Sequence, residues 1–407
     1  MQHYDFILAG GGAAGLSLAL HLVDSPLADR SILVLDKDPK EQDDRTWGFW
    51  TARPGPYDEI IYRSWNRMQI AGEAADGQDY SNLIDLQNYR YHAIRGVDFY
   101  RFAQRKLCAH SNVEFRQGMI TGIEDGEKRA RVHVEGQTVS GGWVFDSILR
   151  REDRQAVAEG FHELKLLFKG WEIETANAVF DPQTIRLLDF RTPQNHDVRF
   201  FYVLPYTPSR ALVEYTLFTQ TPPKRSEYEA ALRSYIVDTL GIPDFDIARE
   251  ESGGLPVTDR PFQRRTGERI MTIGAKGGRL KPTTGYAFSR IQKDSKRIVQ
   301  SLLKRGHPFD IPGDSQVFRA LDTILLEIMQ NQGGQIKPVF TALFRNNPIE
   351  RILRFLDEEA SPAEIGALMA SLPPGLFLKT LLRSKKLHRM TWRSLGLEVR
   401  NNSAKSW

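Results

Sequence analysis

The sequence predicts an α/β protein whose parallel-sheet domain is built from separated chain segments, with a β-rich insertion and a helical C-terminal region. Three observations support this fold class. A glycine-rich turn follows an apolar strand pattern at the N-terminus, and a similar strand-turn-helix pattern returns near residue 270. Long β-rich segments lie between the two patterns, and beyond Gly313 apolar residues recur in helical blocks. A length of 407 residues also favours more than one structural unit.

The first pattern combines a glycine turn with an acidic strand end. Apolar residues 4–9 predict a strand, and a second predicted strand, 31–35, ends on Asp36. The turn after the first strand carries Gly10, Gly12, Ala13, Ala14 and Gly15. Glycines at this spacing let the backbone approach a pyrophosphate, and the strand-end carboxylate can accept both ribose hydroxyls of adenosine. We predict a Rossmann-type dinucleotide-binding domain; the alternative is a chance glycine turn with an ordinary strand-end aspartate.

The other elements follow in chain order. Residues 43–62, rich in Trp, Pro and Gly, predict a loop, and residues 98–109 predict a helix. β-rich segments occupy 164–218, a helix is expected from about 226 to 240, and a strand pattern returns at 269–274. The predicted domains are a discontinuous nucleotide-binding domain (1–70, 96–160 and 265–311), an inserted substrate domain (71–95 and 161–264) and a C-terminal helical region (312–407).

Cysteine content and charge restrict the chemistry. Cys108 is the only cysteine in the sequence, which excludes intramolecular disulfides and multi-cysteine metal sites, and we expect it to be a small core residue. The N-terminus has no leader pattern, which predicts a cytosolic protein. The formal charge is +4, but residues 379–400 hold seven basic residues against Glu398. This basic tail is interpreted as a solvated helix face or an anionic-membrane patch, and we expect no nucleic-acid partner.

The C-terminal region contains apolar, helix-compatible blocks at 318–329, 339–344, 349–356, 362–372 and 375–382. None contains the ~18 to 20 consecutive apolar residues that a transmembrane helix needs. The blocks either pack on one another or place one face in a membrane interface.

The second glycine element extends from Gly274 to Tyr286. It follows a predicted strand and precedes a helix, so its backbone amides can face a second anionic group, which favours FAD over NAD; a structural glycine loop is the alternative. Many flavoproteins have a Gly-Asp pair where this chain has Gly274-Ala275, which weakens a generic flavin-monooxygenase interpretation. The candidate cofactor residues of this element are Gly274, Pro282, Thr283, Thr284, Gly285 and Tyr286.

Five motifs occur in one order along the chain. They are Asp43-Asp44-Arg45-Thr46-Trp47, Phe180-Asp181-Pro182 with Leu188-Asp189-Phe190-Arg191, Leu212-Val213-Glu214-x-Thr216, Glu250-Glu251-Ser252-Gly253-Gly254-Leu255-Pro256, and Lys281-Pro282-Thr283-Thr284-Gly285-Tyr286. In this order they resemble the bacterial lycopene β-cyclase family, which also lacks the flavin Gly-Asp pair. One departure is Tyr215, because an acidic residue often follows the family's catalytic glutamate.

The resemblance implies a glutathione-reductase-like FAD fold and an isomerisation. A proton adds to a terminal double bond of lycopene, the cation closes a six-membered ring and a different proton leaves, giving γ-carotene and then β-carotene. Glu214 is the implied acid, Glu251 is a second candidate, and Asp44, Thr46 and Trp47 form a substrate-side motif. Reduced FAD is implied as the active cofactor, with NADPH or another reductant needed to form it. The family also implies a peripheral protein on the cytoplasmic face of the membrane.

The residues themselves leave several roles open. Glu214 lies in an apolar strand pattern, where burial would raise the pKa of its carboxyl, or it faces solvent or pairs with an arginine. Trp47, Phe49 and Trp50 either stabilise a cation through their ring faces or pack in a loop. Glu251 is predicted at a turn, where a surface role is also open. Two rival functions remain: a redox flavoprotein of the geranylgeranyl reductase or aromatic hydroxylase type, and a non-catalytic carotenoid-binding protein.

Overall fold

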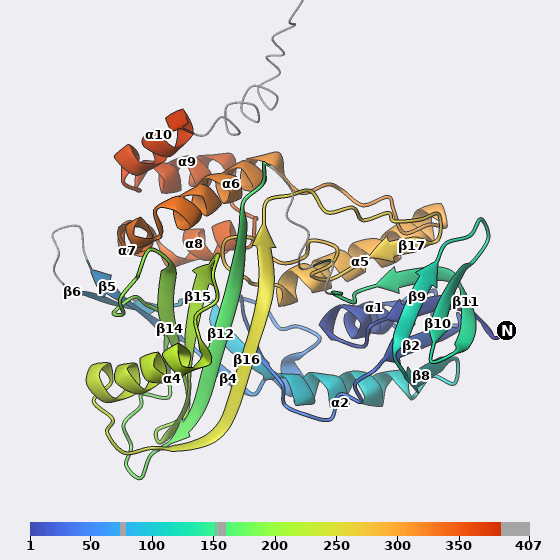
Figure 1. Cartoon of the computed structure of the whole chain (residues 1–407), viewed down its shortest axis with the longest axis horizontal. Coiled ribbons are helices and arrows are strands. Elements are labelled where there is room, and N and C mark those ends of the chain that lie inside the picture. The colour runs from blue at the N-terminus through green and yellow to red at the C-terminus, as the bar shows by residue number, and fades with distance from the viewer. Residues whose placement is uncertain (74–78, 151–152, 154–159, 384–407) are drawn as a thin grey trace, which may run out of the picture.

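The first of three sheets in the described chain is the parallel core. A computed structural model describes residues 1–73, 79–150, 153 and 160–383 (Figure 1). The sheet order is β8-β2-β1-β11-β10-β9, with β17 beside β11. The strands are β1 (His3–Ala9), β2 (Ile32–Asp36), β8 (Val113–Gln117), β9 (Ile120–Glu124), β10 (Ala130–Val134), β11 (Gln137–Asp146) and β17 (Ile270–Thr272). Because β1 is parallel to β2 and β11, and β17 to β11, distant segments share one sheet.

Three helices bury the apolar strands of this sheet. They are α1 (Ala13–Val23), α2 (Gly96–Leu107) and α5 (Phe288–Arg305). Side chains of all three share one core with β1 and β2, and Leu8 and Ile32 in that core have no exposed surface. Continuous apolar runs are typical of parallel strands that are covered on both faces. The predicted α/β class with a Rossmann-type domain is confirmed.

The second sheet is mainly antiparallel and has the order β16-β12-β15-β14-β13-β5-β6. Its strands are β5 (Arg67–Glu73), β6 (Asp79–Asp85), β12 (Glu163–Glu174), β13 (Thr184–Asp189), β14 (Val198–Thr207), β15 (Arg210–Thr219) and β16 (Asp246–Thr258). Side chains on one face, including Val213 and Tyr215, pack under α4 (Arg225–Ser234) and the π-helical turn Tyr235–Thr239. The opposite face, which we call the front face, is covered by the C-terminal helices.

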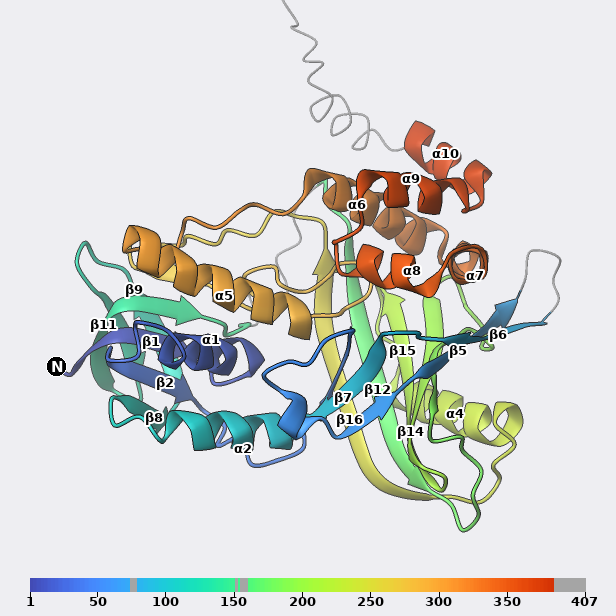
Figure 2. The same ribbon diagram turned by 180° about the vertical axis from the view of Figure 1, so that it is seen from behind.

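The third sheet lies between the other two, with β7 next to the start of α2 (Figure 2). It consists of β3 (Thr46–Thr51), β7 (Arg90–Arg95) and β4 (Arg63–Trp65), and a 3-10 turn, Asp58–Ile60, lies between β3 and β4. The prediction of a loop over 43–62 was therefore wrong at β3. The aromatic residues there pair across the strand, Trp47 opposite Ile94 and Trp50 opposite Tyr91, and aromatic side chains favour such pairing.

The C-terminal region is helical, as predicted. Its helices are α6 (Gln316–Asn331), α7 (Ile336–Asn346), α8 (Ile349–Leu356), α9 (Pro362–Ala370) and α10 (Pro374–Arg383), with a 3-10 turn at Gly333–Gln335. They gather at one end of the second sheet in both views (Figures 1 and 2). Leu326, Ile336 and Ile352 are fully buried in the core that the helices share with the front face. Within the described ranges, no helix is long and apolar enough to span a membrane.

Two further expectations differ from the structure. Glu250 and Glu251 lie within β16 and not in a turn. The adjoining glycines do not end the strand but allow close packing, since a Cβ on Gly253 would lie 2.4 Å from the Phe168 ring. Cys108 is exposed rather than buried, because it caps the C-terminal end of α2 just beyond the buried Leu107. The basic tail from residue 384 lies outside the described residues, and the domain boundaries stay a prediction.

Candidate active site

A cavity of about 460 Å³ lies between the front face, β3 and the segment that precedes α5. We call it the acid cavity because two carboxyl side chains, Glu214 and Glu251, lie in its wall. Other site residues expected from the sequence also line it, namely Asp44, Thr46, Trp47, Thr284, Gly285 and Tyr286. The structure thus brings together residues that are separated by more than two hundred positions in the sequence.

Strand register places the two carboxyl groups side by side. β12 pairs with both β15 and β16, and its Gly170 lies opposite Glu214 on one side and Glu251 on the other. A Cβ on Gly170 would lie 3.4 Å from the Cβ of Glu214 and 3.2 Å from the Cγ of Glu251. The missing side chain therefore leaves room for the two carboxyl groups to meet over the central strand.

The two carboxyl groups have different partners. Glu251 is almost fully buried, accepts a hydrogen bond of 2.9 Å from the Thr46 hydroxyl, and forms an ion pair of 2.8 Å with Arg249. Glu214 is half-buried at the cavity wall and accepts a hydrogen bond of 2.9 Å from the Thr216 hydroxyl. Within the described chain, no cation lies at ion-pair distance from Glu214. Arg249 therefore forms its ion pair with Glu251 and not with Glu214.

These surroundings determine which carboxyl group keeps a proton. Burial and the neighbouring Glu251 carboxylate raise the pKa of Glu214 well above its ordinary value of 4.5. Burial also raises the pKa of Glu251, but Arg249 and hydrogen bonds from Thr46 and Glu214 oppose that rise. Two adjacent carboxyl groups resist double ionisation, so they share one proton, and Arg249 favours the charge on Glu251. The directions of the two pKa shifts therefore favour Glu214, at the cavity wall, as the protonated member of the pair.

Arg249 was not found from the sequence. Its guanidinium contacts Glu251 at 2.8 Å, Glu172 at 2.9 Å and Asp43 at 3.6 Å. Glu172 is also held by Arg210 at 2.5 Å. Arg249 stands two residues before Glu251, so strand alternation puts both on one face, but this signal is informative only once residues 246–258 are known to form a strand.

Tyr215 replaces an acidic residue without touching the acid cavity. It lies on the opposite face of β15, where it is buried and stacks on Phe201 with ring centroids 4.8 Å apart. The second carboxyl group comes instead from Glu251, on a strand two places away. The departure at position 215 therefore leaves the front-face acid pair intact.

Aromatic rings form much of the cavity wall. Trp47 lines the acid cavity and stacks near Phe288, with ring centroids 5.9 Å apart. Phe49 and Trp50 do not line it; Trp50 is buried and donates a hydrogen bond of 2.8 Å to Asp357. The sequence interpretation did not single out Tyr91 and Tyr202, which do line the cavity.

The N-terminal turn fits a dinucleotide pyrophosphate. Gly10 has a φ of +112°, and a Cβ on Gly15 would lie 1.9 Å from the Gly10 carbonyl oxygen, so both positions need glycine. Gly12 caps α1 without a side-chain bond, and nothing lies within 4 Å of the place that its Cβ would take. This open helix N-terminus can accept a phosphate group. Asp36 accepts a hydrogen bond of 2.7 Å from the Gly11 amide, which places its carboxylate beside the turn.

The first helical residues contact the second glycine element. Ala13 and Ala14 begin α1. Gly274 has a φ of +61°, and a Cβ there would lie 2.6 Å from the Cβ of Ala14. The two glycine elements are therefore adjacent in space. Elements adjacent in this way would both contact a cofactor bound at the N-terminal turn.

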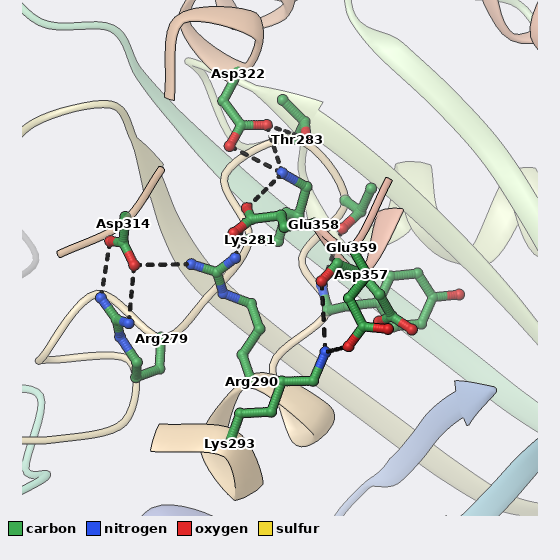
Figure 3. Close-up of polar contacts among 12 residues, drawn as sticks. Arg279, Lys281, Thr283, Arg290, Lys293, Asp314, Asp322, Asp357, Glu358 and Glu359 are labelled. Atoms are coloured by element: carbon green, nitrogen blue, oxygen red, sulfur yellow. Dashed lines mark hydrogen bonds and ion pairs between the residues drawn. The ribbon is translucent and has the colours of Figure 1, made fainter. Parts of the chain in front are cut away.

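The motif from residue 281 to 286 divides into two parts. Thr284, Gly285 and Tyr286 line the acid cavity, whereas Pro282 and Thr283 do not. The Thr283 hydroxyl donates a hydrogen bond of 2.8 Å to Asp322 of α6. Lys281 lies between Asp322 and Glu358, 2.8 and 3.0 Å away, as Figure 3 shows. The first half of the motif thus connects the segment before α5 to the C-terminal helices.

Known proteins share both the sequence pattern and the fold. Lycopene beta-cyclase from Pantoea ananas is 23% identical over 81% of each chain, and the Paracoccus enzyme is 24% identical over 70% of each. Among solved structures, a flavoprotein/dehydrogenase from Cytophaga hutchinsonii has 12% identity and a TM-score of 0.63, covering 97% of this chain and all of that one. A geranylgeranyl bacteriochlorophyll reductase-like protein from Thermoplasma acidophilum has 13% identity and a TM-score of 0.57 with the same coverage. These likenesses support the fold. The model of the lycopene cyclase protein family matches residues 5–382, so the chain belongs to the lycopene cyclase family.

Proposed function

We propose that this protein is a FAD-dependent lycopene β-cyclase, an isomerase that converts lycopene through γ-carotene to β-carotene without net redox change. The observation that carries the proposal is the juxtaposition of Glu214 and Glu251 in a cavity walled by aromatic side chains, where burial raises the pKa of both carboxyl groups. A member of this family needs an acid that stays protonated away from water. Glu214 on the front face of the second sheet is the proposed acid, and the rise of its pKa through burial and the Glu251 carboxylate supports that role.

Each side chain has its own role in the proposed reaction. Glu214 gives its proton to the terminal carbon–carbon double bond, and the resulting cation forms a carbon–carbon bond that closes the six-membered ring. A different proton then leaves the ring, so atoms and electrons balance and the product is an isomer of the substrate. Glu251 stays ionised beside Arg249 and keeps negative charge next to the acid. Trp47, Tyr202 and Tyr286 line the cavity, and aromatic rings stabilise a nearby cation through their π electrons.

The cofactor assignment rests on the glycine elements. Gly10, Gly12 and Gly15 with Asp36 would hold the adenosine diphosphate part, and Thr284 to Tyr286 would border the ring system at the cavity. When bound, reduced FAD supplies negative charge that stabilises a nearby carbocation. A reductant such as NADPH is then needed to form the active state and is not consumed in proportion to product.

We also propose that the protein works as a peripheral protein at the cytoplasmic face of a membrane, because lycopene dissolves in lipid. Lys379 on α10 is exposed and begins the basic segment of the sequence. Basic residues at a surface bind anionic lipid in a salt-sensitive way. Flotation with anionic and neutral vesicles tests this: recovery with anionic vesicles alone, lost at high salt, is expected, and recovery in the soluble fraction at low salt contradicts it.

Product analysis tests the proposed activity. Expression in a lycopene-accumulating bacterium should yield β-carotene, identified by chromatography. The purified protein with reduced FAD should form many products for each NADPH oxidised. Oxidation of one NADPH for each product would instead indicate a reductase or hydroxylase, a class that shares the fold, and pigment that is bound but unchanged would indicate a carrier.

A further inference from the structure

A second cavity adjoins the acid cavity. It lies between the front face and helices α6, α7 and α8, and Tyr202, Thr284 and Tyr286 line both cavities. We call it the apolar cavity, because its other walls are almost entirely hydrocarbon; they include Leu188, Phe200, Phe218, Met329, Phe340 and Phe344. These three side chains stand where the two cavities adjoin, so a ligand that enters both must pass them.

Strand alternation aligns the linings of the two cavities in one strip along β14. On β14, Leu204 lines the acid cavity, Tyr202 lines both, and Phe200 and Val198 line the apolar cavity. These residues stand at every second position and so share the front face. From residue 198 to residue 204 the strip is roughly 20 Å long at ~3.3 Å per residue. A linear molecule can therefore lie along β14 with one end near the acid pair.

The neighbouring strand shows how polarity changes along the strip. On β15, Leu212, Glu214 and Thr216 line the acid cavity, and Phe218 lines the apolar cavity. The polar groups at the junction have partners elsewhere: the Thr283 hydroxyl donates to Asp322, and the Tyr286 hydroxyl lies 3.2 Å from that of Tyr91. A polar ligand would lose its hydrogen bonds to water here, whereas a hydrocarbon would lose none.

We infer that the apolar cavity binds the unreacted polyene chain of the substrate, extended along β14 and β15 with one end at Glu214. The inference rests on the proposed function and deepens it. Only one end of a linear polyene can lie at the acid pair, so the remainder needs an apolar site continuous with it. The free volume here is about 30 Å³, so the chain must displace side chains. Phe340 and Leu356 are half-buried on the helix side of the cavity, so the inference requires these side chains, and not the sheet, to move.

Cavity-filling variants combined with two substrates test this inference. Phe340→Trp and Leu356→Trp each add bulk inside the apolar cavity. Arg345→Trp is the matched control, because it puts the same indole on the exposed side of α7. Each protein is given lycopene and a shorter acyclic terpene with the same end group. Loss of a few buried CH₂ contacts should lower lycopene cyclisation roughly tenfold or more, with the short substrate changed less than about twofold and the control unchanged. Melting temperature and FAD content verify folding.

The outcomes separate this inference from the proposed function. An equal loss for both substrates in a folded variant, or no loss for either, overturns the binding of the polyene in the apolar cavity. If the parent protein cyclises neither substrate, the proposed function fails, and binding alone then decides the inference.

Binding is measured in the Glu214→Gln background, where turnover is expected to be strongly reduced. This protein should retain lycopene through gel filtration in detergent. The double variant with Phe340→Trp should lose most of the pigment, whereas the double variant with Arg345→Trp should keep it. Retention by the Phe340→Trp double variant would overturn the inference. Phe340→Ala, which enlarges the cavity, should keep the pigment, so a loss there would also count against it.

Discussion

Two buried ionic regions of this protein contain the same residue types but differ in their balance of positive and negative charge. In the acid-pair region, Arg249 faces Glu172, Glu251 and Asp43, while Glu214 has no cation of its own among the described residues. In the lysine cluster, Arg279, Lys281 and Arg290 face Asp314, Asp322 and Glu358 (Figure 3). Three cations thus meet three carboxylates in the cluster, whereas carboxyl groups are in excess around Arg249.

The pKa values follow this charge balance. Burial alone would raise the pKa of Glu358, but Lys281 and Arg290 hold it below its ordinary value. In the acid-pair region burial prevails, and the pKa values of Glu214 and Asp43 are raised. A balanced cluster keeps its charges and joins elements together, whereas an excess of carboxyl groups retains a proton that can be given away.

The largest effect is expected from Glu214→Gln. An amide has the shape of the carboxyl group but cannot act as an acid, so cyclisation should fall by ~10²- to 10⁴-fold, the usual range for a general acid. Folding and FAD content should stay unchanged, because the variant removes no ion pair. Glu250→Gln is the control on β16, since Glu250 is exposed and pairs with Lys169. Near-parental activity of Glu214→Gln, measured by chromatography, would place the acid elsewhere, with Glu251 next to test.

Lys281→Met should lower the stability of the protein strongly, as Glu214→Gln should lower its activity. It leaves the buried Asp322 without its ammonium partner, whereas the half-buried Glu358 keeps its pair with Arg290; breaking a buried pair typically costs roughly 3–5 kcal/mol. Denaturant unfolding measures the loss. Lys293→Met is the control, because its pair with Glu359 is exposed and should contribute no more than about 1 kcal/mol. Equal changes in the two variants would mean that Lys281 is not the centre of the cluster.

Gly170→Ala tests the closeness of the acid pair. The new methyl group would lie 2.9 Å from Leu212, 3.2 Å from the Cγ of Glu251 and 3.4 Å from the Cβ of Glu214, so Leu212 and the two glutamate side chains must shift to make room. Small displacements of a reacting group cost roughly 10- to 100-fold in rate, and we expect a loss in that range with folding retained. Gly366→Ala is a control in α9, where the added methyl group meets nothing within 4 Å. An unchanged rate in Gly170→Ala would show that the pair need not be in contact.

Arg249→Gln tests how the positive charge of Arg249 affects the protonation of Glu214 and Glu251. The acid must be protonated to act, so the rate falls as pH rises through the pKa of Glu214. Removing a positive charge raises the pKa values of both carboxyl groups, so the alkaline limb should move up by roughly one pH unit. Arg210→Gln is the control, since it removes a partner of Glu172 and leaves Glu251 paired. A limb that stays in place or moves to lower pH would contradict this assignment.

The sequence predicts the parts of the site that local pattern determines. Gly10, Gly12 and Gly15 with Asp36 lie within one strand-turn-helix-strand unit, so their roles could be predicted without knowing the rest of the fold. Glu214 was identified through a family resemblance, because alternation alone does not decide which face of a strand is buried.

The remaining parts depend on contacts between distant segments. The register that sets Gly170 between Glu214 and Glu251 joins three strands that are far apart in the sequence, and no local pattern encodes it. Thr283 was predicted as a cofactor residue, but its hydroxyl bonds to Asp322, which comes from a helix about forty positions later. Arg249 could be recognised only after its segment proved to be a strand.

Asp357 is a carboxyl group beside the lysine cluster that behaves like those of the acid-pair region. Its replacement is expected to have the smallest effect. Burial raises the pKa of Asp357 from 3.8 to about 6, and its side chain accepts a hydrogen bond from Trp50. The folded protein therefore holds this proton more tightly than the unfolded chain, so stability falls as pH rises from about 4 to about 6 and stays lower above that. Asp357→Asn keeps an acceptor for Trp50 and removes the charge. At pH 7.5 it should raise the free energy of unfolding by at most about 3 kcal/mol, the equivalent of the pKa shift, and near pH 3.5 by little, because the carboxyl group is then mostly protonated in both the folded and the unfolded protein. Denaturant unfolding of both proteins at the two pH values measures the difference, with Glu359→Gln, an exposed neighbour, as the control. A gain that is equal at both pH values would mean that the charge on Asp357 is not the cause.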